Sequence, residues 1–136
     1  MATLRQLIYS VLENDAKIGT AGHLGNLLGH TAADPYGIFF MNPPKKPEFP
    51  LITYYDLSSS GEMPRIEAFN FTVWSGDINA ILELIYKLLH RKCLGVASDV
   101  QPVQMMSNWI GPTVFDENFE IYARATRYLV LGVHVD

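Results

Sequence analysis

Residues 65–91, RIEAFNFTVWSGDINAILELIYKLLHR, decide the fold, because they predict a strand, a tight turn and a helix in direct succession. Residues 65–74 contain neither Gly nor Pro and are rich in aromatic and β-branched side chains, which suit a pleated sheet. Apolar groups occupy both faces of this strand, including Phe69 and Phe71 on one face and Ala68 on the other. We therefore expect a central strand that is covered at least partly on each side.

The helix that follows is predicted by an apolar stripe. Its apolar residues recur at intervals of three and four, the spacing of one face of an α-helix. They are Ile78, Ile81, Leu82, Ile85, Leu88 and Leu89. Ser75 or Asp77 is placed to cap the first turn, and Gly95 is placed to close the last one. No other stretch offers as much apolar surface, so we expect the core to form against this helix.

A shorter helix is predicted at residues 3–14. Thr3 and Gln6 match a capping box at its start, and Asn14-Asp15 are expected to end it. An apolar stripe with helical spacing runs along it, formed by Leu4, Leu7, Ile8, Val11 and Leu12. Like the longer helix, it is expected to pack on the sheet.

Strands are predicted on both sides of a proline-rich loop. Residues 37–41 form a short apolar run, and residues 51–57 form a longer one with two tyrosines. Between them, residues 42–50 contain four prolines, which lack the N–H group that a sheet ladder needs. The strands at 51–57 and 65–74 are close in sequence, so an antiparallel hairpin is expected.

The C-terminal part of the chain is predicted to add strands. Residues 96–117 are interpreted as one or two short strands and a loop, and residues 119–135 as one long strand with alternating side chains. The element order predicts a single α+β domain, residues 1–136, with a mainly antiparallel β-sheet. The N-terminal helix and the one long helix pack on that sheet.

Composition narrows the functional class. The chain has 136 residues and a net charge of −4, from ten basic and fourteen acidic residues. Proteins that neutralise nucleic-acid phosphates usually carry the opposite balance. No apolar run of signal-peptide type occurs, and no stretch approaches the roughly 20 apolar residues that a membrane span needs. We therefore expect a protein that is made and kept in a cytoplasm, with no membrane partner.

Residues 19–37 are rich in Gly and His and allow two interpretations. One is a phosphate-cradling loop, but the glycine spacing matches neither of the usual nucleotide-binding motifs. The other is a mobile surface loop. His23, His30 and Asp34 offer metal-ligand chemistry without the spacing of a compact site. A small-ligand- or nucleotide-binding enzyme that uses this loop is the alternative function, and a monomeric regulatory module is a third.

The single cysteine, Cys93, is a weak catalytic candidate. His90 lies three residues before it, within reach at the end of a helix. No third residue is evident to orient that pair, and a lone cysteine is usually a small buried apolar side chain. The sequence therefore points away from an enzyme.

Three blocks carry a resemblance to a known family. They are the proline-bounded loop and strand at residues 47–55 (PEFPLITYY), the strand, turn and helix at 65–89, and the closing strand at 122–130 (YARATRYLV). Together with the short helix at 3–14, they resemble the tail-completion family of tailed bacteriophages, the tail terminator or head–tail joining proteins.

The resemblance implies a structural subunit of the virion. Such a subunit forms a ring, typically a homohexamer, that caps the tail tube at the head–tail interface. Its partners are further copies of itself, the tail tube protein and a head-completion or connector protein, while DNA passes through the lumen without specific binding. The resemblance implies no enzyme activity, no metal and no cofactor, and it places synthesis in the host bacterial cytoplasm.

Two groups of residues are candidates for the contacts of this ring. The proline loop is expected to be mobile in the free subunit and to contact a partner after assembly, through Pro43, Pro44, Lys45, Lys46 and Pro47. A second group is more apolar than a surface loop requires, namely Met105, Met106, Trp109 and Ile110. The competing interpretation is that this second group completes the core of the monomer.

Overall fold

A computed structural model describes residues 3–58, 67–95 and 100–134 of the chain. The predictions made for residues 65–66, 96–99 and 135 lie outside these residues. The elements follow in the order α1 (Leu4–Ala16), α2 (Leu24–Leu28), β1 (Ile38–Phe40), β2 (Leu51–Ser58), β3 (Glu67–Trp74), α3 (Ile78–Leu89), β4 (Cys93–Gly95), β5 (Val100–Asp116) and β6 (Ile121–His134). This is the α+β fold that the sequence predicts.

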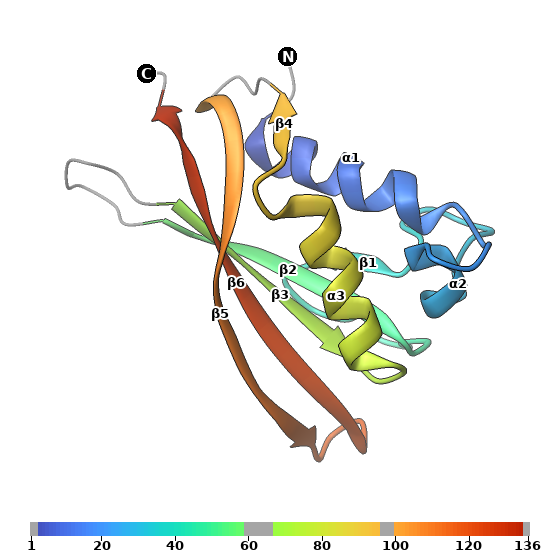
Figure 1. The fold of residues 1–136 in the computed structure, drawn as a ribbon. Helices are drawn as coiled ribbons and strands as arrows, with labels where there is room; N and C mark the ends of the chain where they lie inside the picture. Colours follow the sequence, from blue (N-terminus) through green and yellow to red (C-terminus); the bar gives the residue numbers. More distant parts are fainter. Residues whose placement is uncertain (1–2, 59–66, 96–99, 135–136) are drawn as a thin grey trace.

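The strands form one six-stranded sheet in the order β1-β2-β3-β6-β5-β4. Every neighbouring pair is antiparallel except β1 and β2, which are parallel. The predicted hairpin of β2 and β3 is confirmed, and β3 lies inside the sheet between β2 and β6. Figure 1 shows α1 and α3 on one side of the sheet, and the long β5–β6 ribbon, which belongs to the sheet, extending past the end of β3.

The core lies between these helices and the sheet (Figure 1). α3 buries four residues of its predicted stripe, Ile81, Leu82, Ile85 and Leu89. α1 buries Leu4, Ile8, Leu12 and Ala16. The central strand contributes Phe69, Phe71 and Val73 to this core, all of them at most 1% exposed. The prediction that the core forms against the long helix is therefore confirmed.

The starts of both long helices follow the sequence. At α1 the backbone N–H of Gln6 donates to Thr3 Oγ1, and the N–H of Thr3 donates to Gln6 Oε1 at 2.9 Å, which is the predicted capping box. At α3 the N–H of Ala80 donates to Asp77 Oδ1. These bonds satisfy backbone donors that would otherwise lack a partner in the first turn.

The end of α3 differs from the expectation. The helix ends at Leu89, and His90 already has an extended backbone. Arg91 then takes a left-handed conformation, with a φ of 57°, and turns the chain towards β4. Gly95 lies within β4, so the prediction that it closes the helix is wrong. An Arg in the left-handed region leaves no sequence signal of the kind that Gly provides.

The strand β5 is longer than the sequence indicates. Its 17 residues replace the one or two short strands and loop expected for residues 96–117, so that prediction is wrong. The register with β6 shifts between Ser107 and Trp109 and again between Ile110 and Thr113. Such bulges absorb extra residues within one strand, so the Asn, Gly and Pro found there do not end it.

The segment at residues 19–37 is packed rather than a free loop, because it contains helix α2. Leu24 and Leu28 of this helix belong to the core. The Asp15 carboxylate accepts a hydrogen bond from the N–H of Leu24 at 2.7 Å and contacts His23 Nδ1 at 2.7 Å. This contact holds α2 against the end of α1. The helix α1 ends at Ala16, just past its predicted end at residues 14–15.

Gly25 in α2 has no room for a side chain. A Cβ there would collide with the carbonyl oxygens of Ile18 and Ala16, and these backbone atoms cannot rotate away. We expect Gly25→Ala to lower the free energy of unfolding by about 1–3 kcal/mol, measured by chemical denaturation. Gly19→Ala is the matched control, because the nearest atom is an ordinary 3.7 Å away and the change should be within about 0.5 kcal/mol. Equal effects of the two substitutions would contradict the tight packing of α2.

Candidate interaction surface

The sheet face opposite the helices carries a groove at the β5–β6 end. Among the described residues, no helix covers this face (Figure 1). Trp74 reaches it because side chains alternate along β3 and Phe71 and Val73 point into the core. The groove has a volume of about 400 Å³. Its lining residues are Thr72, Trp74, Trp109, Pro112, Val114, Phe115, Asp116, Ala123, Arg124 and Ala125.

Hydrogen bonds between strands hold the polar residues on this face in place. Trp74 Nε1 donates to Thr53 Oγ1 at 2.8 Å. Asn70 uses both ends of its amide: its Oδ1 accepts from Arg127 Nε at 3.1 Å, and its Nδ2 donates to the Tyr55 hydroxyl at 2.9 Å. Thr53 and Asn70 are buried. The contacts link β2, β3 and β6, so this face is preorganised in the free chain.

Trp109 is fixed in orientation although 43% of its surface is exposed. The bulge after Ser107 places it opposite Arg127 of β6. The Arg127 guanidinium lies 5.5 Å from the centroid of the indole ring, within the range of a cation–π contact. The ring also lies against Gly111, where a Cβ would collide with it. An exposed aromatic side chain held in one orientation loses little entropy on binding, which is typical of an interface residue.

The second predicted interaction group does not form one patch. Met105 is completely buried in the core, so its predicted interface role is wrong, and Met106 is partly buried. Trp109 borders the groove and Ile110 borders the pocket beside α3, because successive residues of a strand face opposite sides of the sheet. The bulge after Ser107 also places Trp109 on the face opposite Met105, and the sequence does not reveal this bulge.

The end of the β5–β6 ribbon is apolar and exposed. Val114, Phe115 and Tyr122 are each more than half exposed, and the rings of Phe115 and Tyr122 meet edge to face at 5.2 Å. On its other side, β5 pairs with no described strand along residues 108–116. Exposed apolar side chains beside an open strand edge favour association with another chain.

The turn that joins β5 to β6 is acidic. Asp116, Glu117 and Glu120 lie within it or beside it, and residues 105–122 contain no Lys, Arg or His. Asp116 Oδ1 accepts from the N–H of Phe119 at 3.0 Å and so caps the turn. The groove therefore ends at a region of negative charge.

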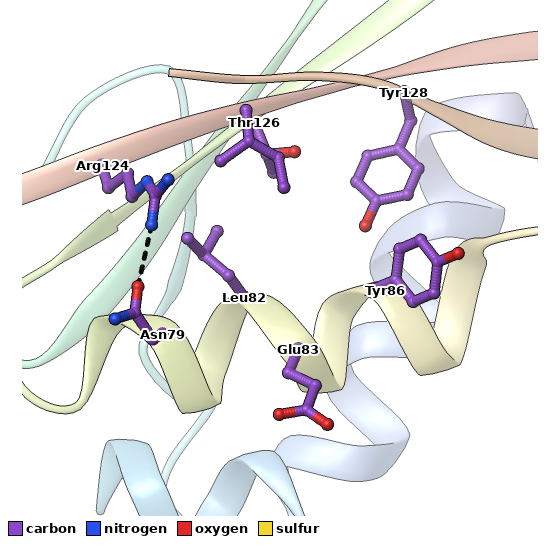
Figure 2. Close-up of a pocket in the computed structure, with 8 residues that line it drawn as sticks. Asn79, Leu82, Glu83, Tyr86, Arg124, Thr126 and Tyr128 are labelled. Carbon is purple, nitrogen blue, oxygen red and sulfur yellow. Dashed lines mark hydrogen bonds between the residues drawn. The ribbon is translucent and has the colours of Figure 1, made fainter. Parts of the chain in front are cut away.

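A second pocket, of about 210 Å³, lies between α3 and β6. Figure 2 shows Arg124 and Tyr128 of β6 facing Asn79, Leu82 and Tyr86 of α3 across it. Arg124 donates from Nη1 to Asn79 Oδ1 at 2.9 Å and from Nε to the carbonyl oxygen of Gly111 at 2.7 Å. It therefore ties the helix to both strands of the ribbon. Burial raises the pKa of the Tyr128 phenol above its usual value.

The proline loop begins and ends against the sheet. The first predicted interaction group lies here: Pro43, Pro44 and Pro47 are partly buried, and Lys45 and Lys46 are exposed. The Phe49 ring meets the Phe119 ring at 5.4 Å, and Phe119 in turn meets Trp74 at 6.1 Å. One end of the loop is thereby held beside the groove.

The residues considered for chemistry take part in separate structural contacts. His23 contacts Asp15, His30 Nε2 lies 2.9 Å from the carbonyl oxygen of Pro50, and Asp34 accepts a hydrogen bond from Tyr9. Within residues 3–58, 67–95 and 100–134, no group of three His, Cys, Asp or Glu side chains could hold a metal ion.

In the other candidate pair, His90 contacts residues other than Cys93. His90 Nδ1 accepts from the N–H of Ser107 at 3.0 Å, and its ring stacks on Tyr86. Cys93 is exposed at the start of β4, so the prediction that it is buried is wrong. A three-residue edge strand leaves its side chain open to solvent.

No protein-family model matches the chain, and a search of curated proteins found no match. None of the helices in the described residues is both long and apolar enough to cross a membrane.

Proposed function

We propose that this protein is a structural subunit of a tailed bacteriophage that assembles into a ring at the end of the tail tube. The ring terminates the tube and joins the tail to the head, with DNA passing through its lumen. Its contacts are with further copies of itself, with the tail tube protein and with a head-completion or connector protein. The protein acts within the virion and has no catalytic role.

The observation that carries the proposal is the preorganised aromatic groove beside an exposed, apolar ribbon end. Trp109, Val114, Phe115 and Tyr122 together leave more apolar surface open than a monomer needs. A subunit in a closed ring uses two different patches, one for each neighbour. The ribbon end and the proline loop can serve as two such patches. The sequence singles out the proline loop for assembly, and Tyr122 of the ribbon end lies in one of the blocks that carry the resemblance.

Electron microscopy of phage particles that lack this protein tests the function directly. We expect tails of uncontrolled length, or finished tails that are not joined to heads. Supplying the wild-type protein in trans should restore joined particles of uniform length. Normal virions formed without the protein would rule out the terminator function.

Shortening the proline loop is expected to separate assembly from folding. Deletion of residues 43–47 removes side chains that are at most partly buried, so the thermal unfolding midpoint should shift by only a few degrees. Joining of heads to tails should nevertheless be lost, because the loop is expected to contact a partner. Deletion variants that join tails normally would show that the loop is only a connector.

A further inference from the structure

We infer that the aromatic groove receives the proline segment, residues 43–47, of a second copy of this chain. This inference rests on the proposed function, because it names the partner of the same surface. It joins the two candidate interaction regions in a single contact, in which the segment is the ligand and the groove is the receptor. The contact is head-to-tail, since each copy offers a segment to one neighbour and a groove to the other.

The composition of the segment matches the chemistry of the groove. Residues 43–47 read PPKKP, so Pro44 and Pro47 are three residues apart. In a polyproline II helix, which repeats every three residues, they lie on one face, about 9 Å apart. In the free chain the backbone bends at Lys45 and Lys46, so the segment has to straighten to adopt this form, and its prolines limit the entropy lost on docking. Grooves lined by aromatic side chains bind such segments. Trp74 and Trp109 line this groove, and Trp109 is held in place by Arg127.

The charges of the two surfaces are also complementary. Lys45 and Lys46 are exposed, and neither forms an ion pair with another described residue. The groove ends at the acidic turn, where Glu117 and Glu120 are exposed. With Pro44 and Pro47 against the aromatic rings, the two lysines project from the other faces of the helix towards water and this turn.

The occupant is a second copy rather than the same chain. In the free chain the groove is lined by residues of β3, β5 and β6 only, and none of its own residues 43–47 lies in it. The chain's own loop ends beside the groove, where the ring of Phe49 lies on Phe119 and Phe119 meets Trp74. Its residues 43–47 nevertheless lie outside the groove, which therefore stays open to the segment of a neighbour.

Disulfide trapping between two populations of the full chain tests this assignment. In a Cys93→Ser background, which leaves no other thiol, one population carries Glu48→Cys and an affinity tag, and the other carries Val114→Cys. Glu48 is exposed and follows the segment directly, so both prolines of the contact are kept. Val114 borders the groove and is 54% exposed. A matched control population carries Tyr86→Cys, a position on α3 that is 43% exposed. The populations are mixed with oxidised glutathione, and tagged heterodimers are quantified by non-reducing gel.

We expect the Glu48/Val114 heterodimer to exceed the Glu48/Tyr86 heterodimer roughly tenfold, because docking raises the effective concentration of the two thiols. Lys45→Glu with Lys46→Glu in the first population should remove most of this excess. Glu117→Lys with Glu120→Lys in the second should restore it. Asp116 is left unchanged because it caps the turn.

Two outcomes would overturn the inference. One is an equal yield with Val114 and with the control. The other is closure of a chain that carries both cysteines into a crosslinked monomer, without heterodimers between chains, since the segment would then occupy its own groove. Failure here is distinct from failure of the proposed function, because particles lacking the protein report on tail joining whichever surfaces form the ring. If crosslinking were specific but particles lacking the protein had normal tails, the proposed function would be wrong and the contact between copies would still be supported.

Discussion

Ile85→Ala is expected to lower the free energy of unfolding by about 2–5 kcal/mol, because it leaves a cavity in the middle of the core. Ile85 is completely buried on the face of α3 that meets the sheet, in one cluster with Phe71 and Tyr128. Chemical denaturation monitored by circular dichroism measures the loss. For a domain of this size, a change of that order shifts the thermal midpoint by many degrees.

Glu83→Ala provides the surface control for this prediction. Glu83 lies on the same helix, is exposed, and pairs with Lys87 at 3.4 Å. Exposed pairs of this kind contribute little, so the control should change stability by no more than about 0.5 kcal/mol. Equal, small effects of both substitutions would show that α3 does not cover the sheet as the structure has it.

The elements that could be predicted are those whose signals are local. Residues 67–89 combine strand composition, an Asp77 cap and a stripe of helical spacing, and all three agree with one another. The same holds for α1, where the capping box and the apolar stripe coincide. A sequence predicts an element reliably where independent local signals agree.

The elements that could not be predicted depend on tertiary contacts. β5 continues through Asn108, Gly111 and Pro112 because bulges absorb them, whereas each of these residues normally indicates a turn. α2 forms in a glycine-rich stretch because Asp15 binds its first turn and buried leucines hold it to the core. Propensity favours a loop at both places, and packing overrides it.

The sequence predicts the candidate surface only in part, for the same reason. The chemistry of Trp109 indicates an interface residue, but its neighbours on the surface come from other strands. A hydrogen-bond network across three strands joins Asn70, Tyr55 and Arg127, and no spacing in the sequence predicts it. The strongest available signal was Trp74, which alternation places on the face opposite Phe71.

Trp109→Glu is expected to abolish ring assembly and leave the subunit folded. The side chain is 43% exposed, and the new carboxylate would lie near the Arg127 guanidinium, so folding costs little. Removing an aromatic residue of this kind from an interface typically weakens binding by about 2 kcal/mol or more, roughly thirtyfold. Light scattering and electron microscopy with purified tails measure assembly, and thermal unfolding measures the fold.

Met105→Glu in the same strand distinguishes interface from core. Met105 is completely buried, so a carboxylate there has no partner and should unfold the chain or lower its stability by several kcal/mol. Trp109→Phe keeps an apolar ring at the groove and should retain part of the assembly. We therefore expect a folded chain that does not assemble for Trp109→Glu, and an unfolded chain for Met105→Glu. Unfolding of both variants would place Trp109 in the core. Normal rings with Trp109→Glu would show that the groove is not part of the interface, because an interface that buries the indole ring against a neighbour could not accommodate a charge there.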